Sequence, residues 1–345
     1  MHARHLHALS RRGLAKPRVR RGLALLVAAI GVSIGVPVFL AGGNVFSRLG
    51  GVPAWVLGGA PALMLAAWCA NGVRVSILAD ANGYRLMPSY AWLIGAGGDF
   101  GASLGPGGVT GIAAYAYLLA RTGLGSATAT ALYAVEKLLD QIIFAAALTA
   151  SAIILALLAK GTEPWALFEI AFGICIGFLI LIVIMLLQYR RMIRALTWLA
   201  TQLRVNEHHR RHFIRWGIAF RNGLTKATAM PRAHIALLVL AAAGYWTARF
   251  AILPLVALGL GAPVPWGYLI AVQILTMFAG QVSFLPGGTL TVEVVFAALL
   301  LPWMDRASLG LMLLVWRGSV FYFTLVGGGM AFVAAVLKRR TLSSA

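Results

Sequence analysis

The chain has 345 residues, of which 61% are hydrophobic and 11% are charged, and its formal net charge is +20. A mean hydropathy of +0.87 over this length excludes a soluble globular domain and predicts an all-α polytopic membrane protein. The positive charge would suit a nucleic-acid partner, but the cations gather between apolar segments and no nucleic-acid-binding motif surrounds them, so none is expected.

The chain begins with a basic segment, which six apolar segments follow. Residues 1–22 hold seven Lys and Arg residues and no small-residue cleavage site, so we interpret them as a retained cytosolic tail and not as a signal peptide. The apolar segments are each about 20 residues or longer, the length that crosses a bilayer. They are 23–41, 54–79, 126–159, 165–187, 235–259 and 307–337.

Two further apolar stretches, 90–120 and 267–300, are each interrupted in the middle. The interruptions read "SLGPGG" (103–108) and "SFLPGG" (283–288). Proline and glycine break a helix, and hydrocarbon does not tolerate bare backbone groups unless protein surrounds them. Each stretch is therefore either one kinked crossing or a re-entrant helical hairpin that enters and leaves on the same side.

The positive-inside rule favours the hairpins. With two hairpins, the tail, the ten cations of loop 188–234 and Lys338-Arg339-Arg340 all lie on one side, which is then the cytosol. The spacing of apolar residues in this loop predicts an amphipathic helix that lies on anionic lipid headgroups. The alternative is that its cations only fix the topology. The predicted organisation is a tail 1–22, a first membrane half 23–187 with hairpin 90–120, a basic cytosolic loop 188–234, a second half 235–338 with hairpin 267–300, and a cytosolic tail 339–345.

The two halves repeat the order span, broken hairpin, span, but in opposite orientation, which is typical of the inverted repeats of secondary transporters. After each break a second half-helix begins, near Val109 and near Leu290. The free N–H groups and the dipole of these two ends predict a site for an anion such as a phosphate. The alternative is two buried turns without a ligand.

Charged side chains inside the apolar segments are the other candidates for substrate binding. Each costs about 2.5–3.5 kcal/mol at the centre of a span, so each should face a polar cavity or a partner. The candidate substrate-binding residues are Arg74, Asp99, Pro106, Gly107, Gly108, Glu136, Lys137, Asp140, Arg249, Pro286, Gly287, Gly288, Glu293 and Arg317. Arg249 and Arg317 would attract a phosphate while the carboxylates balance them or carry protons; static ion pairing is the alternative, and Asp99 could instead cap a turn.

Several chemistries have no motif here. There is no Walker A sequence, no GxSxG, and no histidine within an apolar span. We therefore expect no catalytic residues, no metal and no cofactor. The tryptophans, Trp68 and Trp246 among them, are interpreted as an interfacial belt near the span ends.

Two segments carry a resemblance to a known family. "YLLARTGLGSATATALYAVEKLLD" (117–140) and "FLPGGTLTVEVVFAALL" (284–300) resemble motifs of the lysylphosphatidylglycerol synthase transmembrane region, or flippase-like domain, of bacterial and archaeal inner membranes. The resemblance covers roughly 50–335. The residues that match are Pro286, Gly287, Gly288, Glu293, Glu136 and Asp140. The chain departs from the family in two places. The family usually has glycine where this chain has Leu290. Its first hairpin often carries an acidic residue and an arginine after the break, where this chain has "GPGGVTGIAAYAYLLAR".

The resemblance implies a multi-pass protein of the bacterial inner membrane, with both termini cytoplasmic and without the family's soluble aminoacyltransferase domain. The expected function is a translocator that moves an anionic phospholipid or lipid-linked headgroup between leaflets. The alternative is a scaffold, without transport, for a lipid- or glycolipid-modifying enzyme; an intramembrane enzyme is the weakest hypothesis. The sequence leaves open a homo-oligomer, the lipid and the energy source.

Overall fold

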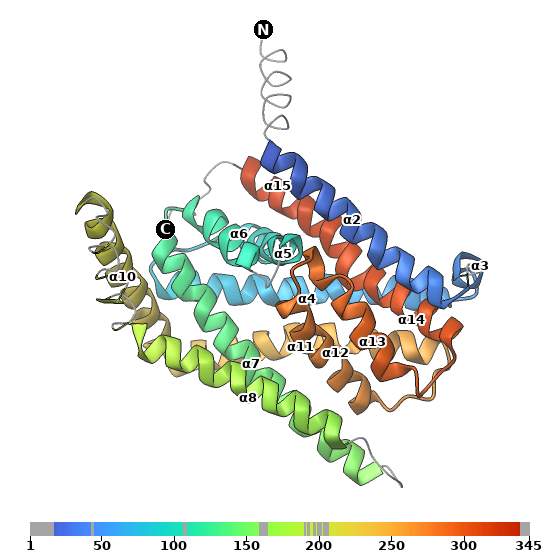
Figure 1. The fold of residues 1–345 in the computed structure, drawn as a ribbon. Coiled ribbons are helices and arrows are strands. Elements are labelled where there is room, and N and C mark those ends of the chain that lie inside the picture. The colour runs from blue at the N-terminus through green and yellow to red at the C-terminus, as the bar shows by residue number, and fades with distance from the viewer. Residues whose placement is uncertain are drawn as a thin grey trace.

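The computed structural model describes residues 17–42, 45–105, 109–158, 165–189 and 207–338, together with positions 191, 194, 195, 198 and 202. All regular elements in these residues are helices, which confirms the all-α prediction (Figure 1).

Five helices of the described residues are long and apolar enough to cross a membrane, one fewer than predicted. They are α4 (Ala54–Ala81), α7 (Ser126–Leu158), α8 (Trp165–Leu187), α11 (Arg232–Gly259) and the continuous helix from Arg306 to Leu337. The predicted span 23–41 falls in α2 (Pro17–Leu40), whose apolar part is described from Ala24 to Leu40.

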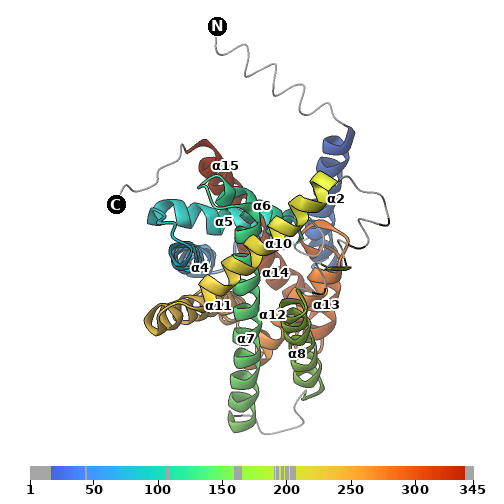
Figure 2. The same cartoon turned by 90° about the vertical axis from the view of Figure 1, so that its left-hand side faces the viewer.

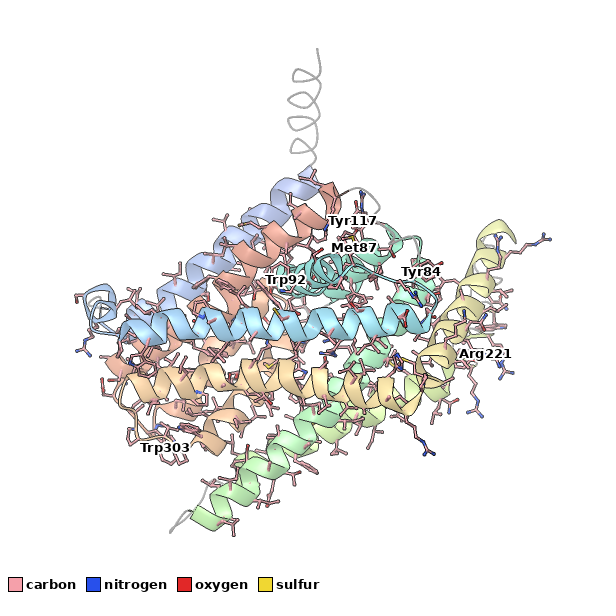
Figure 3. The ribbon with its side chains drawn as sticks, turned by 180° about the vertical axis from the view of Figure 1, so that it is seen from behind. Tyr84, Met87, Trp92, Tyr117, Arg221 and Trp303 are labelled. Carbon is pink, nitrogen blue, oxygen red and sulfur yellow. The ribbon has the colours of Figure 1, made fainter. Side chains whose placement is uncertain are left out.

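Helices α4 and α11 lie side by side along most of their lengths (Figures 1 and 3). A Cβ on Gly259 would meet Val56, and one on Gly244 would meet Ala70, so the two helices run antiparallel. In Figure 3, Tyr84 at the end of α4 accordingly lies on the same side as α10 (Glu207–Thr228), which precedes α11. Small residues on the facing surfaces let the two backbones approach closely.

Each interrupted stretch contains two short helices in place of one long one. Helix α5 (Pro88–Leu104) packs on α6 (Val109–Ala120), and α12 (Trp266–Val282) packs on α13 (Thr291–Leu300). None of the four is longer than about 26 Å, so none spans a hydrocarbon core of about 30 Å alone. The first break, with the candidate residues Pro106, Gly107 and Gly108, lies outside the described residues.

The second break is a short 3-10 turn, η2 (Pro286–Gly288), in which glycine is required. Gly287 and Gly288 have φ angles of 63° and 67°, in the left-handed region that glycine adopts freely. A Cβ on Gly287 would clash with the ring of Phe321. Leu290, just before α13, has φ 71° and ψ −51°, a strained conformation for a residue with a side chain.

The remaining helices cover the outside of this arrangement. The last long helix consists of α14 (Arg306–Arg317), the π-helical segments η3 (Gly318–Tyr322) and η4 (Thr324–Gly328), and α15 (Gly329–Leu337). Helix α2 packs along α14, and α8 packs along α7 (Figures 1 and 2). Large apolar side chains such as Phe39 and Leu157 are exposed on these outer helices, as expected of a surface that faces lipid.

Helix α10 lies in the predicted basic loop 188–234 and packs against the start of α7, where Gly223 contacts Thr128 (Figure 2). Its buried face is made of small residues, whereas Arg215, Arg221 and Lys226 are exposed. The helix is therefore amphipathic, with its cations directed away from the bundle.

Replacing Leu290 by glycine should stabilise the protein. The change relieves a backbone strain of about 1–3 kcal/mol and loses little packing, because the side chain is 47% exposed, while glycine adds an entropic cost of about 0.5–1 kcal/mol. We expect a higher midpoint of thermal unfolding in detergent for Leu290→Gly. The control is Leu301→Gly, because Leu301 is 44% exposed and has a helical φ of −56°; this variant should be less stable. Equal destabilisation by both changes would contradict the strain.

Candidate functional site

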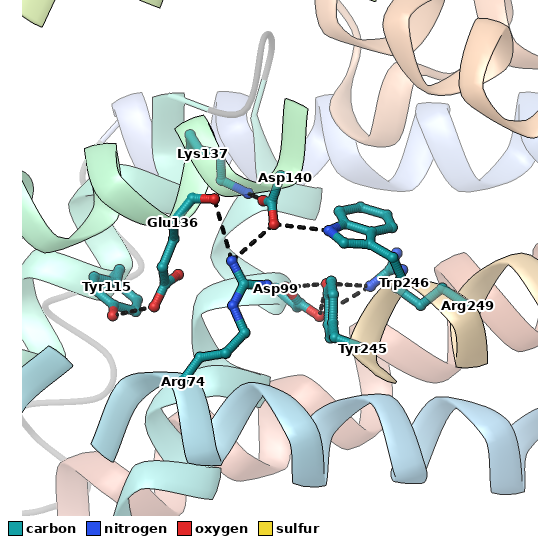
Figure 4. Close-up of polar contacts among 9 residues, drawn as sticks. All are labelled: Arg74, Asp99, Tyr115, Glu136, Lys137, Asp140, Tyr245, Trp246 and Arg249. Carbon is teal, nitrogen blue, oxygen red and sulfur yellow. Dashed lines mark hydrogen bonds and ion pairs between the residues drawn. The ribbon is translucent and has the colours of Figure 1, made fainter. Parts of the chain in front are cut away.

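Nine polar and aromatic side chains from five helices gather between the long helices (Figure 4). This central cluster consists of Arg74 (α4), Asp99 (α5), Tyr115 (α6), Glu136, Lys137 and Asp140 (α7), and Tyr245, Trp246 and Arg249 (α11). Seven of the nine, all except Trp246 and Arg249, line a small, partly open cavity of about 30 Å³. The structure thus brings six of the predicted site residues together in one cluster, and five of them, all except Arg249, line the cavity.

Asp140 joins three helices through its carboxylate and is only 2% exposed. Its Oδ1 accepts hydrogen bonds from Arg74 Nη2 at 2.8 Å and from Trp246 Nε1 at 2.7 Å, and its Oδ2 lies 2.8 Å from Lys137 Nζ. The lysine is on the same face of α7, three residues earlier. Asp140 lies 14 residues, or about 21 Å, from the start of α7, well inside the helix and not at its end.

Asp99 forms the second meeting point. Its Oδ2 accepts hydrogen bonds from Trp68 Nε1 at 3.1 Å and from Arg249 Nη1 at 3.0 Å, and the hydroxyl of Tyr245 donates to it at 3.0 Å. Arg249 Nη1 also donates to the Tyr245 hydroxyl at 2.8 Å, one turn earlier on α11. The carboxylate of Asp99 therefore faces the cavity and its partners on α4 and α11, and the alternative of a local turn cap is wrong.

Two cations, Arg74 and Lys137, line the cavity. Arg74 is 1% exposed, yet its Nε has no hydrogen-bond partner among the described residues, and its Nη2 also reaches the backbone carbonyl of Glu136 at 3.3 Å. The side chain of Lys137 is 42% exposed. Glu136 Oε1 accepts a hydrogen bond from the hydroxyl of Tyr115 at 2.6 Å. A buried guanidinium N–H without a partner is costly, so a ligand group that accepts from it would bind favourably.

A second cluster forms around the other break in the chain. Glu293 is fully buried, and its Oε1 accepts hydrogen bonds from Arg317 Nε at 2.8 Å and from the hydroxyl of Ser33 at 2.8 Å. Arg317 Nη1 donates to the carbonyl of Gly287 at 3.1 Å and so ties α14 to the turn η2. Glu293 stands in the first turn of α13, where its negative charge complements the positive end of the helix.

Within the described residues, the hydrogen bonds and ion pairs of the two clusters have no residue in common. Arg249 pairs with Asp99, and Arg317 pairs with Glu293. The sequence predicts that both arginines attract a phosphate. In the structure each arginine instead pairs with a different carboxylate. Glu293 and Arg317 do not line the cavity, and neither do the candidates Pro286, Gly287 and Gly288; in the second cluster the alternative of static pairing fits the geometry.

Sequence reasoning missed four aromatic members of the site. Tyr115 and Tyr245 were not singled out, and Trp68 and Trp246 were assigned to the membrane interface. Both tryptophans are instead buried, with 1% and 4% exposure, and donate to carboxylates of the site. A signal was present, since each lies more than ten residues from either end of its long helix, too far for an interfacial position.

Replacing Asp140 by asparagine should be strongly destabilising. The variant leaves Arg74 buried without its counter-charge, and breaking a buried pair in this way costs about 3–5 kcal/mol. The measurement is the free energy of unfolding in detergent. Asp80→Asn is the control, because Asp80 pairs with Arg85 at 3.7 Å with both side chains exposed, and such surface pairs contribute less than about 1 kcal/mol. Similar losses in the two variants would show that the buried pair is not special.

Comparison with known proteins adds to this geometry. Residues 26–328 match the family described as the lysylphosphatidylglycerol synthase TM region. The match contains both interrupted stretches, both clusters and the whole cavity. Among curated proteins, no sequence matches the chain. The family resemblance seen in residues 117–140 and 284–300 is thus confirmed, and the chain belongs to the family of the lysylphosphatidylglycerol synthase transmembrane region, a multi-pass membrane family.

Proposed function

We propose that the protein moves a phospholipid with an anionic headgroup, or a lipid-linked headgroup, between the two leaflets. One observation carries the proposal: a partly open cavity inside an apolar bundle is lined by two cations, the buried Arg74 and the partly exposed Lys137. A phosphate is the group that such donors bind best, because charge-assisted hydrogen bonds are about twice as strong as neutral ones. The acyl chains would stay in the hydrocarbon while the headgroup passes through the cavity.

The charge balance of the central cluster fits this role. Arg74, Lys137 and Arg249 are matched by the carboxylates Asp99, Glu136 and Asp140, three charges of each sign. Unpaired cations at this depth would be expensive, so the carboxylates allow the cations to remain in the bundle while no headgroup is bound. A phosphate can then compete for Lys137, whose partner Asp140 keeps Arg74 and Trp246.

We further infer that the two halves form an inverted repeat with re-entrant hairpins. Helices α4 and α11 have 28 residues each and α5 and α12 have 17 each. Lys137 is the twelfth residue of α7, and Arg317 is the twelfth residue of α14. Each hairpin packs on the long helix that follows the hairpin of the other half, α12 on α7 and α5 on α15. In transporters with such repeats, access alternates as one repeat moves against the other.

The proposed orientation places the basic loop with α10, and both termini, in the cytoplasm of a bacterial cell, with the bundle in the inner membrane. The exposed cations Arg215, Arg221 and Lys226 on α10 support this side, because cytoplasmic loops are enriched in Lys and Arg.

The same basic face supports a second candidate, a scaffold that binds a lipid- or glycolipid-modifying enzyme without moving lipid. In that case the cations of α10 would be needed for co-purification of the enzyme, and the charges of the cavity would not. A second copy of the chain is another occupant that this face would allow.

Lys137→Gln tests transport. The protein is reconstituted into vesicles with a fluorescent anionic phospholipid, and its movement between leaflets is followed by quenching of the outer label. Loss of one charge-assisted hydrogen bond, worth about 1.5–3 kcal/mol, should lower the initial rate at least about tenfold. The variant should still fold, because Asp140 retains two donors.

Arg221→Gln is the matched control, because it removes one exposed cation from α10, away from the cavity, and should leave the rate unchanged. Wild-type protein that moves lipid no faster than protein-free vesicles would contradict the transport proposal. Loss of co-purification of a lipid-modifying enzyme after substitution of the α10 cations would then support the scaffold.

A further inference from the structure

Two buried tryptophans occupy equivalent places in the two halves of the protein. Trp68 is the fifteenth of the 28 residues of α4, and Trp246 is the fifteenth of the 28 residues of α11. They are 178 residues apart, the same separation as the starts of the two helices. Both are at most 4% exposed, and each donates its indole N–H to a carboxylate of the central cluster.

The two carboxylates are held in a crossed arrangement. Asp99 binds Trp68 from α4 and Arg249 from α11. Asp140 binds Trp246 from α11 and Arg74 from α4. Each carboxylate thus receives a tryptophan from one half and an arginine from the other, and the pair joins the two antiparallel helices twice. Figure 4 shows the contacts of Asp140 with Trp246 and Arg74 and that of Asp99 with Arg249.

We propose that Trp68 and Trp246 are paired positioning residues, each fixing the carboxylate that holds the arginine of the opposite half beside the cavity. An indole N–H suits this task because it donates a hydrogen bond without adding a charge. A lysine or arginine in its place would upset a cluster that already holds three charges of each sign. The consequence for lipid movement rests on the proposed function; the pairing itself does not.

Aromatic neighbours fix the direction of both indoles. The ring of Trp68 stacks on Phe323 in the last span, with centroids 5.4 Å apart, and meets Trp92 edge-on at 5.8 Å. The ring of Trp246 meets Phe144 edge-on at 4.4 Å. Such packing leaves the indole few alternative orientations, so the N–H determines where the carboxylate oxygen lies.

The protein supplies a matched comparison for these residues. Trp316 is also 4% exposed and donates its indole N–H, but to the neutral side-chain oxygen of Gln273 at 3.3 Å. Neither residue lines the cavity. Trp316→Phe therefore removes a buried indole hydrogen bond of the same kind without touching an arginine-bearing carboxylate.

The first test measures the initial rate of movement of a fluorescent anionic phospholipid in vesicles for Trp68→Phe, Trp246→Phe and Trp316→Phe. Phenylalanine keeps most of the ring packing and removes only the donor. The first two variants should each be about tenfold slower than wild type, and the third should stay within about twofold. Equal rates for all three variants would overturn the positioning role.

The second test is a double-mutant cycle with Asp99→Ala, which tests the crossed pairing. Trp68→Phe should add little to Asp99→Ala, because both remove the same contact, whereas Trp246→Phe should be additive with Asp99→Ala. Equal coupling of both tryptophans to Asp99 would overturn the crossed pairing. Asp99 is the preferred partner because it is less buried than Asp140, and its variant should fold.

The same cycle is measured on thermal unfolding in detergent, where no transport is needed. If wild-type protein moves no lipid, the proposed function fails, and the unfolding cycle alone still decides whether the tryptophans pair as described. If the unfolding cycle shows coupling while both phenylalanine variants move lipid at the wild-type rate, the hydrogen bonds are real and the positioning role is wrong.

Discussion

Charge neutralisation inside an apolar bundle is the constraint on which the rest of this structure depends. Six charged side chains of the central cluster lie between helices whose outer surfaces are apolar, and none could remain there alone at acceptable cost. Asp140 satisfies the requirement most fully, since one carboxylate accepts from an arginine, a lysine and a tryptophan on three helices. The positions of α4, α7 and α11 relative to one another are therefore coupled to the pairing of these groups.

The backbone imposes a second condition, which the second cluster meets. A helix broken by Pro-Gly-Gly leaves carbonyl and N–H groups without intrahelical partners. Arg317 donates to the carbonyl of Gly287 while its charge is balanced by the buried Glu293. The two clusters thus differ in their physical character. The central cluster borders a cavity, whereas the second cluster is buried away from it and uses its charges to hold a turn.

Membership of the lysylphosphatidylglycerol synthase transmembrane region family associates the protein with membrane lipids. The side chains of the site suggest how the protein would bind a lipid headgroup. Donors that face a cavity and carboxylates that balance them are suited to transient binding, because a headgroup can replace an internal partner without leaving an uncompensated charge. The crossed hydrogen bonds of Asp99 and Asp140 join the two halves at the place where a headgroup would bind, so occupancy and helix position are linked by contact.

The sequence by itself determined the membrane class, the two interrupted stretches and the set of charges that must find partners, because hydrocarbon length and the cost of buried charge act on local sequence. Lys137 and Asp140 could be paired in advance because one helical turn separates them. Only the tertiary structure decided the partners of Arg249 and Arg317 and the carboxylates to which Trp68 and Trp246 donate. Such contacts join residues up to 260 positions apart, and their identity depends on how helices pack, which no local pattern encodes.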